Sequence, residues 1–297
     1  MVKIRIATRR SPLALWQANH VASLLAKIDQ VEPELVAIDT APDLDLSQSI
    51  SDIGGKGAFS KEVQTLVLAG QADIAVHSAK DLQAITPEGL VIGAYPERGA
   101  MADCLVGSRL AELAPGATVA TGSNRRRALL LDIRPDLEIV GLRGNVGTRL
   151  QKLAEADIAA IVVARAALER LGERPDVVEE LDVETFIPQV GQGSLAVECR
   201  AEDTMTADLL SHIDHEPTRT TVSAERDFLV ELGGDCDLPA GANAILGSDD
   251  KLTIRGVLAS PPDVGGRLQR ADVVELALAR PGQILARRLR AAANVGS

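Results

Sequence analysis

Apolar residues follow two different periods along the chain. Short and nearly continuous apolar runs predict buried β-strands at residues 3–8, 34–39, 72–78, 89–95, 117–121, 137–142 and 158–164. Longer segments between several of these runs have helical spacing, for example residues 11–28, where Ser11 is the expected N-cap and Pro12 the first helical residue. Buried strands that alternate with helices predict layered α/β domains with parallel strands.

The pattern changes after about residue 215. A helix is expected at residues 218–232, and Gly233 with Gly234 should end it. Three segments of alternating polarity and a last helix then predict an antiparallel α+β unit, at residues 241–246, 251–259, 271–278 and 281–293. We therefore expect three domains: an α/β domain of residues 1–96 with 192–214, an α/β domain of residues 97–191 and an α+β domain of residues 215–297.

The composition narrows the classes of function. A formal net charge of −11 argues against a general nucleic-acid-binding protein, although 24 of the 31 basic residues are arginines, which suit carboxylate or phosphate ligands. The three cysteines, at positions 104, 199 and 236, do not have the spacing of a zinc site or a disulfide scaffold. Because no apolar run is long enough to cross a membrane and no signal-peptide pattern is visible, we expect a cytoplasmic protein.

Polar residues gather directly after four of the predicted strands. In an open α/β sheet, ligands bind beyond the carboxyl ends of the strands, near helix N-termini. The residues in these places are rich in cations: Arg9 and Ser11; Ser78, Lys80 and Asp81; Thr121, Ser123, Arg125 and Arg126; Arg143 and Arg149. This pattern favours an anion site. A solvated helix face for the arginines and a surface ion pair for Asp81 fit the same residues.

Cys236 stands between two acids in the turn LGGDCDLP, residues 232–239. An ordinary cysteine and a reactive one both fit these residues when they are taken alone. The turn belongs to a series of six segments, which read IATRRSPLALWQA, IGGKGAFSKE, ADIAVHSAKDL, LRGNVGTRLQKL, VGQGSLAVECR and VSAERDFLVELGGDCDLP. In content and order these segments resemble the porphobilinogen deaminase family, also called hydroxymethylbilane synthases.

The resemblance covers about the first 240 residues and implies a fold and an activity. The fold would be two periplasmic-binding-protein-like α/β domains plus a small α+β C-terminal domain that carries a cysteine. The activity would be that of a transferase, which joins four porphobilinogen molecules head to tail with loss of ammonia, starting from a dipyrromethane cofactor held by a cysteine thioether. Hydrolysis then releases hydroxymethylbilane. The resemblance further implies a monomer, transfer of the product to uroporphyrinogen-III synthase, and no metal, nucleic acid or membrane partner.

Matched position by position, the resemblance implies roles for single residues. Asp81 matches the catalytic aspartate, and Cys236 matches the cysteine that carries the cofactor. The other residues implied to bind the cofactor are Lys80, Ser78, Thr121, Ser123, Arg125, Arg126, Gly144 and Gln192. The residues implied to bind substrate are Arg9, Ser11, Lys56, Phe59, Arg143, Arg149 and Arg170. Arginines suit this chemistry because porphobilinogen carries acetate and propionate arms.

Several residues depart from the usual pattern of the family. Gln83 replaces a proline shortly after Asp81, Asp52 stands where a basic residue is common, and Asp235 replaces a glycine next to Cys236. Carboxylates beside a thiol disfavour its reactive thiolate form. The alternative to an active enzyme is therefore a catalytically impaired paralogue, a bilobal protein that binds an anionic ligand.

Overall fold

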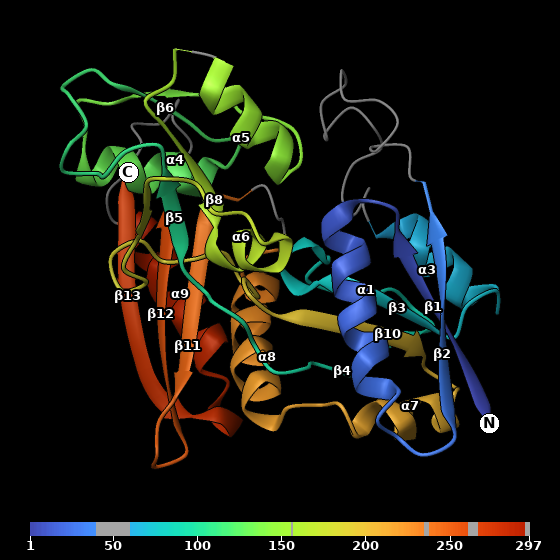
Figure 1. The fold of residues 1–297 in the computed structure, drawn as a ribbon. Helices are drawn as coiled ribbons and strands as arrows, with labels where there is room; N and C mark the ends of the chain where they lie inside the picture. The colour runs from blue at the N-terminus through green and yellow to red at the C-terminus, as the bar shows by residue number, and fades with distance from the viewer. Residues whose placement is uncertain (40–59, 156, 235–237, 261–266, 295–297) are drawn as a thin grey trace. The chain divides into compact units, whose positions relative to one another are not determined.

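The structure is a computed structural model that describes residues 1–39, 60–155, 157–234, 238–260 and 267–294 (Figure 1). The chain forms two compact units: unit 1 is Met1–Gly99 with Ser194–Val222, and unit 2 is Ala100–Gly193 with Ser223–Ser297. The division into three domains, with residues 215–297 as a domain of their own, stays a prediction. Among the described helices, none combines the length and the apolar character that a membrane crossing needs.

Unit 1 is built on a five-stranded sheet in the order β2-β1-β3-β10-β4. Its strands are β1 (Val2–Arg9), β2 (Val31–Ile38), β3 (Ile74–Ser78), β4 (Leu90–Ala94) and β10 (Leu195–Arg200). β1 is parallel to β2 and β3, whereas β10 is antiparallel to β3 and β4. The expectation of parallel strands throughout is therefore wrong, because an apolar run records burial on both faces of a sheet but not the direction of the strand.

Helices cover both faces of this sheet. Ile4 and Ile6 of β1 face α1 (Pro12–Leu25) and α7 (Thr204–Ser211), whereas Ala7 faces α3 (Lys61–Leu68) on the other side. Ser11 accepts a hydrogen bond from the backbone N–H of Ala14, which confirms it as the N-cap of α1. A short 3₁₀ helix, η1 (Ala79–Asp81), follows β3 directly.

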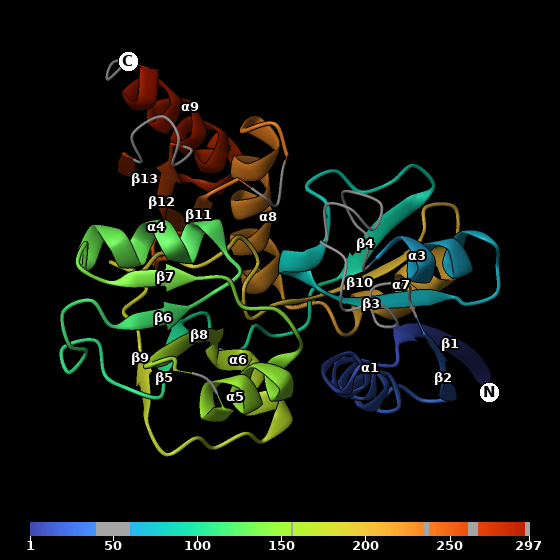
Figure 2. The same cartoon turned by 90° about the horizontal axis from the view of Figure 1, so that it is seen from above.

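Unit 2 contains a second five-stranded sheet, in the order β7-β6-β8-β5-β9. Its strands are β5 (Asp103–Val106), β6 (Thr118–Ala120), β7 (Glu138–Val140), β8 (Ala160–Ala164) and β9 (Val178–Glu180), of which β5 and β9 are not predicted from the sequence. β6 is parallel to β7 and β8, and β5 is antiparallel to β8 and β9. α4 (Asn124–Ile133) covers one face, and α5 (Val146–Glu155) with α6 (Arg165–Leu171) covers the other (Figure 2).

The C-terminal part of unit 2 is the small α+β structure that the sequence predicts. β11 (Ala240–Leu246), β12 (Lys251–Ala259) and β13 (Leu268–Leu276) form an antiparallel sheet. α8 (Glu216–Glu231), which begins in unit 1, and α9 (Pro281–Asn294) pack on one face of it, and η3 (Ala277–Ala279) precedes α9. The two helices touch closely, since a Cβ at Gly282 would overlap the backbone oxygen of Ala224. Two α/β sheets and this α+β part confirm the predicted fold class.

Candidate functional site

Residues from two distant segments meet at one edge of the unit 1 sheet. Because β1 and β3 are parallel neighbours, their carboxyl ends lie side by side. Arg9 and Ser11 stand at the end of β1, and Ser78, Lys80 and Asp81 stand at the end of β3 and in η1. Asp81 is exposed, and Ser78 and Lys80 are partly buried. The structure thus brings together the described unit 1 residues that are implied to act on cofactor and substrate.

A buried glutamine that the sequence does not single out orients one of these residues. Gln17 of α1 is 3% exposed, and its Nε2 donates a hydrogen bond to Oγ of Ser78 at 2.7 Å. The hydroxyl hydrogen of Ser78 can then point toward a ligand, because its oxygen already accepts a bond from Gln17. The only signal in the sequence is a polar residue on the buried face of a predicted helix.

A second set of functional candidates meets at one edge of the unit 2 sheet. β6, β7 and β8 are parallel, so the segments after them lie at the same edge. Thr121, Ser123, Arg125 and Arg126 follow β6, Arg143, Gly144 and Arg149 follow β7, and Arg170 lies in the helix after β8. β5 runs the other way, which places its first residue, Asp103, at this edge as well.

Asp103 is the centre of a buried ion-pair cluster. It is fully buried, and its Oδ2 accepts from Nη2 of Arg125 at 2.7 Å, while its Oδ1 accepts from Nη2 of Arg126 at 2.6 Å. Burial by itself would raise the pKa of Asp103, but the charges of Arg126 and Arg125 outweigh it and hold the pKa well below its usual value. The interpretation of this turn as a solvated face is wrong for both arginines, which are 3% and 6% exposed.

One hydrogen-bond donor of this cluster has no acceptor among the described residues. Two guanidinium groups face one carboxylate, so Asp103 neutralises only one of the two positive charges. Nη1 of Arg125 donates to the backbone oxygen of Ile187 at 2.7 Å, but no described residue accepts a hydrogen bond from its Nε. A buried donor of this kind is costly unless a partner is present. An anion that reached this cluster would satisfy that donor and balance the second positive charge.

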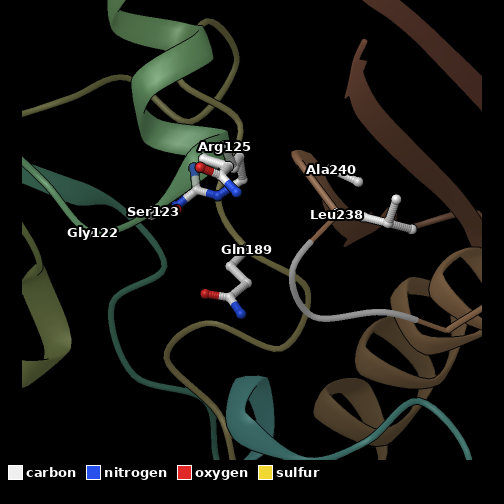
Figure 3. A pocket seen from close by; sticks show the side chains of 7 residues that line it. Gly122, Ser123, Arg125, Gln189, Leu238 and Ala240 are labelled. Carbon is white, nitrogen blue, oxygen red and sulfur yellow. The ribbon is translucent and has the colours of Figure 1, made fainter. Parts of the chain in front are cut away.

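Arg125 also lines a cavity of about 70 Å³ at the N-terminus of α4 (Figure 3). The other lining residues are Gly122, Ser123, Asn124, Gln189, Leu238 and Ala240. Ser123 is the N-cap of α4, where backbone N–H groups and the helix dipole favour a negative charge. Leu238 is the second residue after Cys236 in the chain, so the cavity lies beside the segment that follows this cysteine.

The remaining residues of the predicted set hold short polar contacts in unit 2. Gln192 is buried and donates from Nε2 to the backbone oxygen of Met101 at 2.8 Å and to Oδ1 of Asp103 at 2.9 Å. Arg170, whose pKa is lowered by burial, donates to the backbone oxygen of Gly193. Nε of Arg149 donates to the oxygen of Gly144 at 2.8 Å, and Arg143 is exposed.

Gly144 itself has φ +115°, and a Cβ there would come within 2.7 Å of the Thr148 side chain, so this turn requires glycine. Five further residues of interest, Lys56, Phe59, Cys236, Asp52 and Asp235, lie outside the described residues.

Two family models match the chain. The model of the porphobilinogen deaminase, dipyromethane cofactor binding domain, matches residues 4–208, and that of the porphobilinogen deaminase C-terminal domain matches residues 219–280. The chain belongs to the porphobilinogen deaminase family. A relative from Brevibacillus brevis named porphobilinogen deaminase is 45% identical to it, over 88% of this chain and 86% of its own length. Another of the same name, from Bacillus subtilis, is 42% identical over 88% of this chain and 85% of its own length.

A third relative, the porphobilinogen deaminase of Nitratidesulfovibrio vulgaris, is 44% identical over 87% of this chain and 83% of its own length. The residues that carried the resemblance therefore belong to a match over most of the chain. As a member of this deaminase family, the chain is a transferase of tetrapyrrole biosynthesis, and residues 4–208 match the domain that binds the family's dipyrromethane cofactor.

The residues around the cavity fit such a cofactor. A dipyrromethane built from porphobilinogen carries carboxylate arms, and the cavity is lined by the N-terminus of α4 and by a buried arginine whose Nε has no partner among the described residues. Arg125, Ser123 and Asn124 would hold a carboxylate there.

Gly241 gives Arg125 the room to lie in this position. A Cβ at Gly241 would come within 2.6 Å of the oxygen of Pro188 and 2.9 Å of Cδ of Arg125. Gly241→Ala should therefore displace Arg125, lower the free energy of unfolding by about 1–3 kcal/mol and reduce the fraction of purified protein that carries the cofactor. Denaturant unfolding and intact mass measure the two effects.

Gly141→Ala is the matched control, because a Cβ at Gly141 would meet no atom of the described residues within 4 Å. This exposed variant should leave both quantities near their wild-type values. If both variants have the same free energy of unfolding and the same cofactor content, the space beside Arg125 does not matter.

Proposed function

We propose that the chain is an active hydroxymethylbilane synthase, which condenses four porphobilinogen molecules onto a dipyrromethane primer linked to Cys236 and releases hydroxymethylbilane by hydrolysis. The observation that carries the proposal is the buried pair Arg125 and Arg126 on Asp103: Arg125 lines a cavity at a helix N-terminus, and its Nε has no hydrogen-bond partner among the described residues. Such a site suits a polycarboxylate, and the same chain keeps Asp81 and Cys236 at the family's positions.

The candidate residues would have different roles in catalysis and in substrate binding. The bound primer supplies the pyrrole carbon to which the first substrate is joined. The carboxylate of Asp81, which is exposed, would accept hydrogen bonds from pyrrole N–H groups, stabilise the positive charge that develops as ammonia leaves, and assist proton transfer. Arg9, Arg143, Arg149 and Arg170 would bind the acetate and propionate arms, with Lys56 and Phe59 as further contacts.

We also propose an oligomeric state, a location and a partner for this enzyme. The protein would work as a monomer in the cytoplasm, without metal, nucleic acid or membrane, and pass its product to uroporphyrinogen-III synthase. A formal net charge of −11 is consistent with the absence of a nucleic-acid partner. Size-exclusion chromatography coupled to light scattering should give a mass near 31.3 kDa.

Intact mass spectrometry of wild type beside Cys236→Ser tests the proposed function. Wild type should carry a mass excess equal to two linked pyrrole units and give a colour with Ehrlich's reagent, whereas Cys236→Ser should show neither, because the thioether needs the sulfur. A wild-type mass that stays unmodified after incubation with porphobilinogen or hydroxymethylbilane would contradict the proposal. The impaired paralogue, with Asp235 as one cause, would then be the better interpretation.

A further inference from the structure

Glu225 of α8 is a fully buried carboxylate that lies outside the predicted set of site residues. Its Oε2 accepts a hydrogen bond from the backbone N–H of Gly191 at 2.8 Å, and its Oε1 accepts one from the backbone N–H of Ala244 at 2.9 Å. Bonds from backbone N–H groups to a carboxylate are stronger than those between neutral groups. One side chain therefore joins three segments of unit 2: α8, residues 189–193 and β11.

Two of these three segments border the candidate site, and the third, α8, precedes Cys236 in the chain. In residues 189–193, Gln189 lines the cavity beside Arg125, Gln192 donates to Asp103, and the oxygen of Gly193 accepts from Arg170. In β11, Ala240 lines the same cavity and Gly241 lies against Arg125. In the chain, α8 precedes Cys236 and β11 follows it. Glu225 thus connects the two elements on either side of the cysteine to a segment that lines the cavity.

Residues 189–193 depend on side chains for their position. They lie outside the helices and strands, and Gly191 and Gly193 have φ values of +71° and +84°. The N–H of Gln192 donates to the oxygen of Gln189 within this segment, while the side chains of Glu225 and Arg170 bond to the backbone of Gly191 and Gly193. A segment held in this way moves when its side-chain contacts are lost.

We propose that Glu225 is a positioning residue for the cofactor site, an inference that rests on the proposed function: it holds residues 189–193 and the start of β11 in the arrangement that receives the cofactor. Both carboxylate oxygens are needed for this. A glutamine at the same position would accept one of the two backbone N–H groups and turn its own NH₂ group toward the other, which leaves that N–H buried without a partner.

The rate at which apo-protein takes up the cofactor tests this role. Apo-protein, made in cells that cannot synthesise porphobilinogen, is incubated with hydroxymethylbilane, and the gain in mass is followed with time. Glu225→Gln should load at least about tenfold more slowly than wild type, as expected when a buried hydrogen bond is lost. Loading at the wild-type rate would overturn the proposal.

Two control variants on the same helix separate positioning from stability and from charge. Phe228→Leu removes buried packing between α8, α9 and the sheet but leaves Glu225 in place. Glu231→Gln makes the same chemical change at a partly exposed residue that pairs with Arg287 at 3.0 Å. Both should load within about threefold of wild type at a temperature where each is folded. If Phe228→Leu loads as slowly as Glu225→Gln at the same melting temperature, Glu225 acts only through stability and the proposal is wrong.

Amide hydrogen exchange of the apo-proteins gives a readout that does not need the cofactor. Glu225→Gln should speed exchange in peptides covering residues 189–193 and 240–246, more than in the rest of unit 2, because the N–H groups of Gly191 and Ala244 lose their acceptor. Uniform or unchanged exchange would overturn the proposal. If wild type itself never loads, the proposed function fails, and this exchange pattern alone decides whether Glu225 positions the two segments.

Discussion

Asp81→Asn should reduce kcat by about 10²–10⁴-fold while the protein stays folded. Asparagine has nearly the same shape, but it is neutral, so it neither stabilises positive charge on a reacting pyrrole nor takes up a proton. Because Asp81 is exposed at the end of η1, the free energy of unfolding should change by less than about 0.5 kcal/mol. Steady-state kinetics, with the cofactor content of each preparation checked by mass, measures the effect.

Asp29→Asn is the matched control for this experiment. Asp29 is also an exposed aspartate of unit 1, but it lies between α1 and β2, at the amino end of a strand parallel to β1. The same loss of charge at the opposite edge of the sheet should leave kcat unchanged. If Asp81→Asn keeps more than about a third of the wild-type kcat, a change too small for a lost acid–base group, Asp81 is not catalytic.

Asp103→Asn should be the most destabilising single substitution in the candidate site. It leaves Arg125 and Arg126 buried without their carboxylate, and breaking a buried pair from one side costs about 3–5 kcal/mol. Both arginines should also lose their fixed positions, so the purified variant should carry less cofactor. Chemical unfolding at pH 7 gives the loss in the free energy of unfolding, and intact mass gives the cofactor content.

The destabilisation by Asp103→Asn should depend on pH in one direction. The pKa of Asp103 is held below its unfolded value of about 3.9. A depressed pKa contributes stability that is present above the unfolded pKa and is lost as pH falls through the folded pKa. The difference in free energy of unfolding between wild type and Asp103→Asn should therefore be constant from pH 7 to about pH 5 and narrow below about pH 4.

Asp136→Asn provides the comparison at the surface. Asp136 accepts from Nη2 of Arg134 at 2.7 Å, but its carboxylate is exposed to solvent, where ion pairs contribute little. The free energy of unfolding of this variant should stay within about 1 kcal/mol of wild type over the same pH range. If the difference in free energy of unfolding between wild type and Asp103→Asn does not narrow at low pH, the carboxylate of Asp103 does not act through its charge.

Much of the fold could be predicted from local pattern. Continuous apolar runs located β1, β3 and β8, and Ser11 and Pro12 located the start of α1, because burial and helix capping depend on neighbouring residues. The alternating segments after residue 240 indicated the antiparallel sheet of β11, β12 and β13. β5, β9 and β10 are not predicted from the sequence, and the antiparallel pairing of β5 and β10 is decided between strands that are far apart in the chain.

For the candidate site too, some features could be predicted from the sequence and others could not. Strand ends rich in arginine, and motifs in the order of a known family, indicated by themselves an anion-binding deaminase with Asp81 and Cys236 as its central residues. Only the tertiary structure decided that Arg125 and Arg126 are buried on Asp103, that Gln17 holds Ser78, and that Glu225 joins Gly191 to Ala244. The physical reason is distance along the chain: Asp103 meets Gln192 across 89 positions, and a polar residue shows no local sign of the partner that makes its burial favourable.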